Sequence, residues 1–180
     1  MIFTKTEIEG LLIIEPSVFR DARGHFLEFY NANEFISNGI PSTFVQDNLS
    51  VSKKGVIRGL HFQEEPYAQG KLVRVTSGAA LDVAVDLRKD SSSFGQSFCL
   101  ELNAENNKML WIPAGFAHGF EALSDDVTFV YKVTQYYNKH SEKGLVFNDS
   151  DLNIKWRTNE PIVSEKDLLL PMLKDYLVKQ

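Results

Sequence analysis

The stretch Ala80–Arg88, ALDVAVDLR, has a strict two-residue periodicity. Successive side chains of an extended chain point to opposite faces, so this period predicts a β-strand. One predicted face carries only large aliphatic side chains, namely Leu81, Val83, Val85 and Leu87. The opposite face carries Asp82, Ala84 and Asp86.

Two other runs show the same alternation on either side of this stretch. In KLVRV, residues 71–75, one face carries Lys71, Val73 and Val75. In VTFVYKV, residues 127–133, one face carries Val127, Phe129, Tyr131 and Val133. Turn signals separate the runs at residues 77–78, 94–95, 113–115 and 124–126. Many short strands with regularly spaced turns predict an all-β sandwich or barrel.

Helical signals are few. One short helix is expected from about Asn31 to Asn38, with Asn31 as the N-cap and Gly39 as the stop. A second is expected to begin near Ser164, where SEKD fits a capping box. The polar segment 138–159 is expected to be a loop. No linker divides the chain, so residues 1–180 are expected to form one domain.

Composition narrows the function classes. Hydrophobic residues make up 43% of the 180 residues, as in globular proteins, and the net charge of -5 argues against general nucleic-acid binding. Cys99 is the single cysteine, which excludes an internal disulfide and a four-cysteine zinc site. No apolar run is long enough to span a bilayer, and Glu7 and Glu9 interrupt any signal-peptide core. A soluble cytoplasmic protein is therefore expected.

The segment Gly55–Lys71, GVIRGLHFQEEPYAQGK, combines a titratable base with two cations. His61 can accept a proton near neutral pH, and Arg58 and Lys71 suit an anionic ligand or a developing negative charge. A lone histidine in a strand is more often structural than catalytic. The three polar groups in an otherwise apolar region favour a site for proton chemistry on an anionic substrate.

The spacing of Arg58 and His61 sets a geometric condition on this site. Residues three apart on a regular strand face opposite sides. Gly59 lies between them, and an isolated glycine in a strand often marks a β-bulge. We therefore predict a bulge that turns both side chains into one cavity.

The segment Pro113–His118, PAGFAH, raises the question of a metal. P-x-G-x-x-H resembles the second metal-binding motif of cupins, in which a turn directs a histidine into the barrel mouth. The first cupin motif normally supplies H-x-H, whereas this chain reads His61-Phe-Gln63. Two histidines are a poor set for a catalytic divalent metal, so we expect a jelly roll without a metal.

Three other features have two interpretations each. Tyr131 fits either a core tyrosine or a proton donor facing the cavity. Asp167 fits either the fourth residue of the capping box or a carboxylate that orients His61. The segment Phe19–Phe26, FRDARGHF, fits a charged hairpin with Gly24 at the bend, and an arginine beside a glycine can also approach a phosphate.

Taken together, these motifs resemble a known family, the dTDP-4-dehydrorhamnose 3,5-epimerases, or RmlC-type sugar-nucleotide epimerases, of the cupin superfamily. The pair R-G-L-H-x-Q and P-x-G-x-x-H-G-F, in this order and at this separation, is the most specific signal. The matching segments are 19–26 with Glu28, 46–50, 55–63 with Lys71, 82–88, 113–120, 131–132, Glu142 and 164–167.

The resemblance implies a cofactor-independent isomerase that inverts C3 and C5 of dTDP-4-dehydro-6-deoxy-D-glucose, giving dTDP-4-dehydro-L-rhamnose on the route to dTDP-L-rhamnose. It implies that His61, paired with Asp167, is the base, that Tyr131 is the acid and that Lys71 stabilises the enolate. The positions that match ligand-binding residues are Arg23, Glu28, Gln46, Asn48, Arg58, His118, Glu142 and Lys166. Phe19 is a weaker candidate, as an aromatic ring that could stack on thymine.

The resemblance also implies a homodimer in which the N-terminal segment, with Arg23 and Glu28, reaches into the partner's site. Other interpretations remain at this point: an epimerase acting only at C3 or on another nucleotide sugar, a metal-dependent cupin using His61, Gln63 and His118, or a non-catalytic sugar-nucleotide-binding module. A base, a cross-cavity acid and a cation argue against a pure binding module, since binding alone needs no base.

Overall fold

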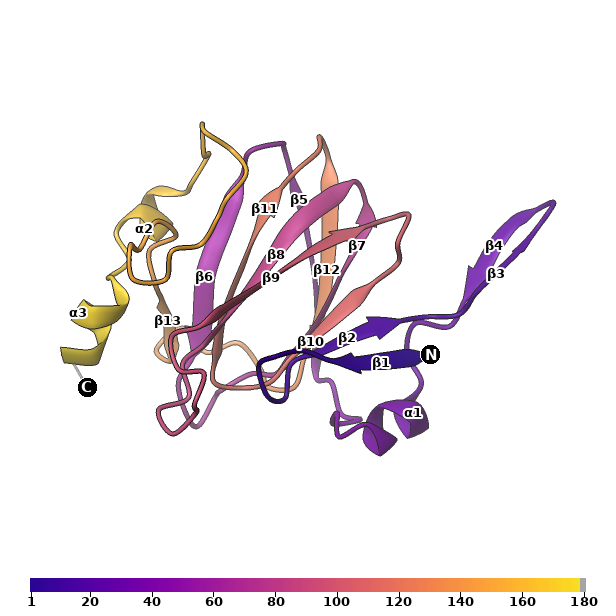
Figure 1. The fold of residues 1–180 in the computed structure, drawn as a ribbon, viewed down its shortest axis with the longest axis horizontal. Helices are drawn as coiled ribbons and strands as arrows, with labels where there is room; N and C mark the ends of the chain where they lie inside the picture. The colour runs from indigo at the N-terminus through magenta and orange to yellow at the C-terminus, as the bar shows by residue number, and fades with distance from the viewer. Residues whose placement is uncertain (179–180) are drawn as a thin grey trace.

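The computed structural model describes residues 1–178, in which antiparallel strands form two facing sheets and a separate hairpin (Figure 1). The first sheet has the order β1 (Ile2–Lys5), β2 (Leu12–Glu15), β10 (Met109–Ile112), β7 (Lys71–Ser77), β12 (Val127–Val133) and β5 (Gln46–Ser52). The second has the order β13 (Glu142–Gly144), β6 (Ile57–Gln63), β11 (Phe116–Ala122), β8 (Ala79–Asp86) and β9 (Ser97–Asn103). The predicted all-β jelly roll is confirmed.

The main core fills the space between the two sheets. Val73 and Val75 of β7 and Phe129 of β12 meet side chains of β8 and β11 there. The rings of Phe120 on β11 and Phe129 on β12 stack with their centroids 4.2 Å apart, so they join the two sheets directly. The alternation in KLVRV and VTFVYKV therefore matches half-buried strands, in which every second side chain points into the core.

Strand β8 is buried on both faces. Its Leu81, Val83 and Val85 face away from the main core, and the C-terminal part of the chain covers them with Leu145 and Leu173. The expectation of a loop over residues 138–159 is wrong in part, because that segment contains β13 and the buried triplet 145–147. These apolar residues lie within a polar stretch that shows no period, and they bury apolar side chains of the second sheet: Leu145 covers β8, while Val146 and Phe147 pack with Ile57 of β6.

The three helices are short. Helix α1 (Ala32–Ser37) has Asn31 as its N-cap, and its end is followed by Gly39 at a φ of +79°. Helix α2 (Glu165–Leu168) begins after Ser164, whose hydroxyl accepts the backbone N–H of Asp167. Helix α3 (Leu173–Val178) follows, and Figure 1 shows α2 and α3 beside β6 and β13. None of the helices within residues 1–178 is long and apolar enough to cross a membrane.

The predicted bulge at Gly59 is confirmed. His61 pairs with His118 and Arg58 with Phe120, so three steps along β6 face two steps along β11. Gly59 has a φ of +106°, which side chains rarely adopt. A Cβ at this position would lie 2.6 Å from the carbonyl oxygen of His118 on the neighbouring strand β11, so only glycine fits there. As a result, Arg58 and His61 line the same cavity.

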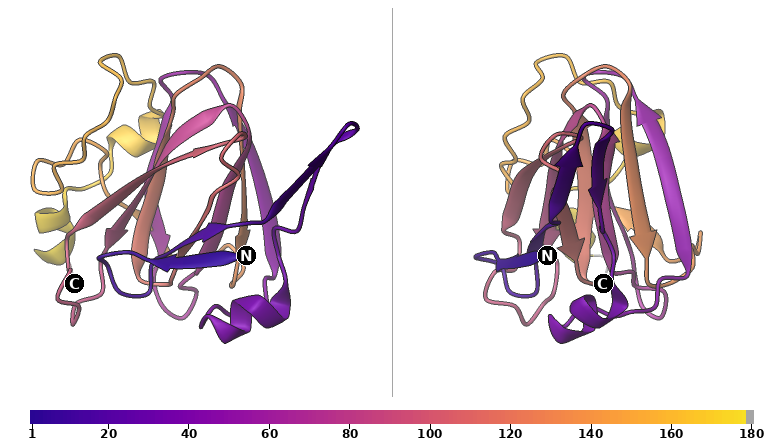
Figure 2. Two further views of the ribbon diagram at one scale, coloured as in Figure 1. Left: turned by 45° about the vertical axis from the view of Figure 1, so that its right-hand side comes forward. Right: turned by 90° about the vertical axis from the view of Figure 1, so that its right-hand side faces the viewer.

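The hairpin of β3 (Val18–Asp21) and β4 (Gly24–Leu27) extends away from the two sheets (Figures 1 and 2). Gly24 lies at its turn with a φ of +130°, as the sequence predicted. Phe19 and Phe26 pair across the two strands and are 64% and 68% exposed. A two-stranded ribbon with exposed aromatic rings has no core of its own to stabilise it.

Candidate active site

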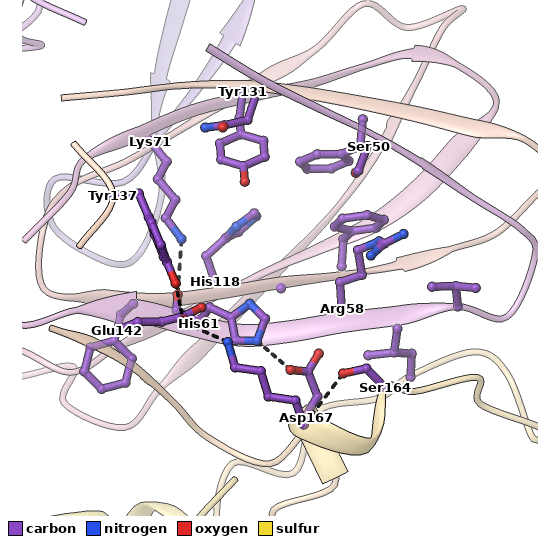
Figure 3. A pocket seen from close by; sticks show the side chains of 18 of the residues that line it. Ser50, Arg58, His61, Lys71, His118, Tyr131, Tyr137, Glu142, Ser164 and Asp167 are labelled. Atoms are coloured by element: carbon purple, nitrogen blue, oxygen red, sulfur yellow. Dashed lines mark hydrogen bonds and ion pairs between the residues drawn. The ribbon is translucent and has the colours of Figure 1, made fainter. Parts of the chain in front are cut away.

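A cavity of about 750 Å³ opens between the two sheets, with β5, β7 and β12 on one side and β6, β11 and β13 on the other (Figure 3). Helix α2 closes part of its rim. The cavity collects most of the side chains that the sequence marked as candidates: Gln46, Asn48, Arg58, His61, Lys71, His118, Tyr131, Glu142, Lys166 and Asp167.

His61 and Asp167 form a hydrogen-bonded pair at the cavity. The Nε2 atom of His61 lies 2.7 Å from Oδ1 of Asp167, although the residues are 106 positions apart. The other carboxylate oxygen of Asp167 accepts the backbone N–H of Gly59 at 3.3 Å. The Asp167 side chain therefore points to the histidine, while Ser164 alone supplies the side-chain cap of α2. Both interpretations of Asp167 are therefore present, because Ser164 caps its backbone N–H while its carboxylate contacts His61.

The surroundings keep Asp167 ionised. Burial by itself would raise the pKa of this carboxyl group, but hydrogen bonds from His61, Gly59 and Ser164 and the charge of His61 lower it below its usual value. In the tautomer that donates from Nε2 to the ionised Asp167, Nδ1 of His61 is the nitrogen with a free lone pair, so it is the atom that can accept a substrate proton.

Lys71 provides a buried cation close to the pair. Its ammonium group donates to the backbone oxygen of His61 at 3.2 Å. Burial lowers the pKa of Lys71 to about 8, while the negative charges of Asp82 and Glu142 act against that shift. At neutral pH the group is therefore mostly charged, and it lies in a water-poor setting where a charge acts strongly on its neighbours.

His118 forms a second histidine–aspartate pair. Its Nε2 lies 2.7 Å from Oδ1 of Asp82 on the neighbouring strand, and both side chains are buried. Burial lowers the pKa of His118 despite the opposing effect of Asp82, so the ring is neutral at pH 7. The sequence marked His118 but not Asp82 as a site residue, because a strand aspartate gives no local sign of the histidine it meets.

Tyr131 faces the pair from the opposite sheet. Figure 3 shows its hydroxyl group pointing into the cavity from the side opposite His61. Burial raises the pKa of Tyr131, and nearby Glu142 adds to the effect while Arg58 opposes it. The hydroxyl therefore keeps its proton at neutral pH and can donate it. His61 and Tyr131 lie on β6 and β12, so a ring bound between them would be reached from both faces.

Polar side chains surround the acid–base pair. The Arg58 guanidinium is held by the Ser52 hydroxyl at 3.0 Å and by the backbone oxygen of Val51 at 3.3 Å. The Gln46 amide donates to the Asn48 side chain at 2.8 Å. Arg58 is thus held beside the Ser52 end of β5, and the two amides lie toward its Gln46 end, so the cavity offers a cation and amide groups at separate points for an anion or a polar ring.

Glu142 is the centre of a smaller network at the rim. One of its carboxylate oxygens accepts from the Tyr137 hydroxyl at 2.9 Å and from the Lys166 ammonium at 2.7 Å. Burial would raise the pKa of Glu142, but these two contacts and the positive charges nearby lower it. Tyr137 also lines the cavity and was missed by the sequence analysis. The tandem tyrosines after β12 were its only local signal.

Phe19, Arg23 and Glu28 do not reach this cavity. Phe19 and Arg23 belong to the projecting hairpin, and Arg23 is paired with Asp21 at 2.6 Å. Glu28 directly follows β4, where it accepts from Asn31 at 3.3 Å. Within one chain, the hairpin and the cavity are separate features.

Gln63 is not arranged as a metal ligand. Its amide nitrogen donates to the backbone oxygens of Tyr67 and Tyr136, and its amide oxygen accepts the backbone N–H of Asn138. Metal coordination would require giving up at least one of these bonds. Residues 1–178 contain no group of three or more His, Cys, Asp or Glu side chains arranged to hold a metal ion.

The comparisons with known proteins agree with this geometry. The family model described as dTDP-4-dehydrorhamnose 3,5-epimerase matches residues 5–175. An enzyme of that name from Shigella flexneri is 53% identical over 165 residues, which cover 91% of each chain. The crystal structure of such an enzyme from Elizabethkingia anophelis is 48% identical, with a TM-score of 0.94 over 97% of each chain.

A further solved structure contains a ligand. It is the Legionella pneumophila enzyme in complex with dTDP-4-keto-L-rhamnose, which is 44% identical, with a TM-score of 0.92 over 96% of this chain and 93% of that one. A family match across nearly the whole chain, together with these identities, settles the relationship. The chain belongs to the dTDP-4-dehydrorhamnose 3,5-epimerase family.

Proposed function

We propose that this protein converts dTDP-4-dehydro-6-deoxy-D-glucose into dTDP-4-dehydro-L-rhamnose by inverting C3 and C5, without a cofactor. The observation that carries the proposal is the His61–Asp167 pair facing Tyr131 across one cavity, with the Lys71 cation beside it. The protons at C3 and C5 flank the C4 ketone of this sugar. Removing either one gives an enolate, which is chemistry that a base and a fixed cation can promote.

In the proposed reaction His61 removes the proton and Asp167 stabilises the imidazolium that forms. The electron pair of the C–H bond forms a double bond between that sugar carbon and C4, and the negative charge develops on O4 of the enolate. Lys71 stabilises that charge, because a buried ammonium is already in place and needs no reorganisation. Tyr131 then donates its proton to the same carbon from the opposite face. The result is inversion at that carbon.

The nucleotide part of the substrate is proposed to bind through the polar side chains around the pair. The cavity lining includes Arg58, Lys166 and His118, which can bind the diphosphate or sugar oxygens. It also includes the amide groups of Gln46 and Asn48. Arginine and lysine bind phosphate well even in a protein of net charge -5, because local rather than total charge decides the contact.

The proposal is tested by incubating enzyme and substrate in D₂O and locating deuterium by NMR. Label at both C3 and C5 is the expected result. Label at C3 alone would show an epimerase that acts at one carbon. No label at either carbon would refute the proposed activity on this substrate.

Tyr131→Phe distinguishes removal of the substrate proton, assigned to His61, from donation of the new proton, assigned to Tyr131. The variant keeps the ring but lacks the hydroxyl proton, so inversion should fall by about 10²–10⁴-fold, the usual range for a general acid. Exchange of the substrate protons with D₂O should be reduced much less, because His61 still removes them. NMR of recovered substrate and product measures both rates on one sample. Inversion at the rate of the wild-type enzyme would show that Tyr131 is not the acid.

We also infer that the protein works as a homodimer in which the β3–β4 hairpin of one chain completes the site of the other. The hairpin leaves its own sheets and exposes Phe19 and Phe26, and the open face of the first sheet exposes Leu49 and Val51 at 65% and 54%. A hairpin of this kind becomes stable when it packs on a partner. Arg23 and Glu28 would then add to a site that lies on the other chain.

Complementation between two inactive variants tests this arrangement. Arg23→Ala should bind substrate weakly, and His61→Ala should be inactive. If the hairpin acts on the partner, a mixed dimer has one intact site, so random mixing after subunit exchange should restore roughly a quarter of wild-type activity. Sedimentation confirms that dimers are present. A mixture no more active than the sum of its parts would contradict exchange of the hairpin.

A further inference from the structure

We infer that Gln63 is a positioning residue that sets the affinity for the nucleotide sugar. It holds the backbone on both sides of Tyr137, and Tyr137 in turn holds Glu142 at the edge of the cavity. The inference rests on the proposed function, since it assigns the affinity of that same site. It concerns a glutamine that touches neither member of the acid–base pair through any of its amide bonds.

The bonding of Gln63 is unusually complete. The residue is only 6% exposed, and its amide nitrogen donates to the backbone oxygen of Tyr67 at 2.6 Å and to that of Tyr136 at 3.1 Å. Its amide oxygen accepts the backbone N–H of Asn138 at 2.6 Å. Both amide protons and the oxygen are therefore used, all on backbone atoms of two loops that border the cavity.

The two contacts to residues 136 and 138 enclose Tyr137. Gln63 holds the carbonyl group of the preceding residue and the N–H of the following one, so it fixes the chain on both sides of the tyrosine. The N–H of Tyr137 itself donates to the Gln46 side chain at 3.2 Å. With its backbone held at three points, Tyr137 presents its ring to the cavity and its hydroxyl group to Glu142.

Only an amide fits this position. Two backbone oxygens need donors and one backbone N–H needs an acceptor, and glutamine supplies both kinds of group at one end. Methionine has a similar length but would leave all three backbone groups without their partner. An ionised glutamate would keep the acceptor and place a negative charge against two carbonyl oxygens. A protonated glutamate has one donor and one acceptor, so it restores part of the arrangement.

Other hydrogen bonds hold this loop at Gln135 and at Asn138, and the bonds from Gln63 add the contacts on both sides of Tyr137 itself. Tyr137 lies between β12 and β13 in a segment without regular secondary structure, and its side chain is 54% exposed. Unfixed, that segment would have to be ordered each time ligand binds, which weakens binding. Proton transfer depends on His61, Lys71 and Tyr131, which regular strands hold in place. Substitution of Gln63 should therefore weaken ligand binding much more than it slows the reaction.

The test uses Gln63→Met and Gln63→Glu in the full-length protein. Calorimetry measures the Kd for dTDP at pH 5.5 and pH 8, and assays give kcat and KM. Gln63→Met should weaken dTDP binding by roughly 10–100-fold, the usual effect of unpaired buried polar groups. Its kcat should fall far less than its KM rises. Gln63→Glu should bind poorly at pH 8 and recover toward the wild-type Kd at pH 5.5, because burial against two carbonyl oxygens should raise the pKa of the new carboxyl group well above its usual value of about 4.3, and only the protonated acid can donate.

A double variant decides whether the effect passes through Tyr137. If it does, Gln63→Met combined with Tyr137→Ala should bind dTDP no more weakly than Tyr137→Ala alone. Additive losses would overturn the inference, as would a Gln63→Met variant that is folded and binds dTDP like wild type, or a Gln63→Glu variant whose defect is the same at both pH values. Failure of the wild-type protein to bind dTDP would instead refute the proposed function, so the two failures are distinguishable.

Discussion

His61→Ala is expected to abolish deuterium incorporation at both C3 and C5. One base serves both carbons in the proposed mechanism, and His61 is the cavity histidine that Asp167 holds in place. His118, the other histidine of the site, is bonded to buried Asp82. The rate of exchange should therefore fall by at least ~10²–10⁴-fold, the contribution of a positioned general base. NMR in D₂O measures the loss at each carbon separately.

Binding of dTDP provides the control for this variant. The histidine is assigned to the sugar carbons and not to the nucleotide, so the Kd for dTDP should change little. Asp167→Asn should also lose exchange strongly, by up to about 10⁴-fold, because it removes the charge that stabilises the imidazolium and no longer fixes the tautomer in which Nδ1 accepts the proton. Exchange at one carbon but not the other in His61→Ala would mean that two different bases act.

Lys71→Met is expected to reduce kcat by about 10²–10³-fold, the range seen when one group stabilising an oxyanion is removed. Methionine nearly preserves the volume of the side chain, so the packing of β7 should be maintained. The loss should be in kcat more than in KM, because the cation acts on charge that develops during the reaction. Steady-state kinetics at pH 7 distinguish the two effects.

The pH profile gives an independent check on Lys71. Burial lowers the pKa of this group to about 8, so it is charged below that pH and becomes neutral above it. The wild-type kcat/KM, which reports the free enzyme, should accordingly decline as pH rises through about 8, and the residual kcat/KM of Lys71→Met should show no such decline. A wild-type rate that stays constant from pH 7 to pH 10 would contradict the role assigned to the lysine.

Much of the fold follows from local patterns that need no partner. The period of two in residues 71–75, 80–88 and 127–133 identified strands, and it also identified which side chains share a face, because a pleated strand allows only two directions. Gly59 identified the bulge, because only glycine tolerates that backbone. Residues 145–147 escaped prediction, since nothing near them shows that they cover the outer face of a sheet built elsewhere in the chain.

The amino-acid sequence was enough to identify the chemical groups of the site: a base, two cations, a tyrosine and the β-strands that carry them. These are properties of residue types and short spacings, and they do not depend on the rest of the chain. The contacts between these groups could be seen only in the folded chain. Folding brought Asp167 to His61 across 106 positions, Asp82 to His118, and Gln63 to the two sides of Tyr137. Such pairings depend on how sheets stack and loops return, and no local pattern encodes the distance between residues far apart in the chain.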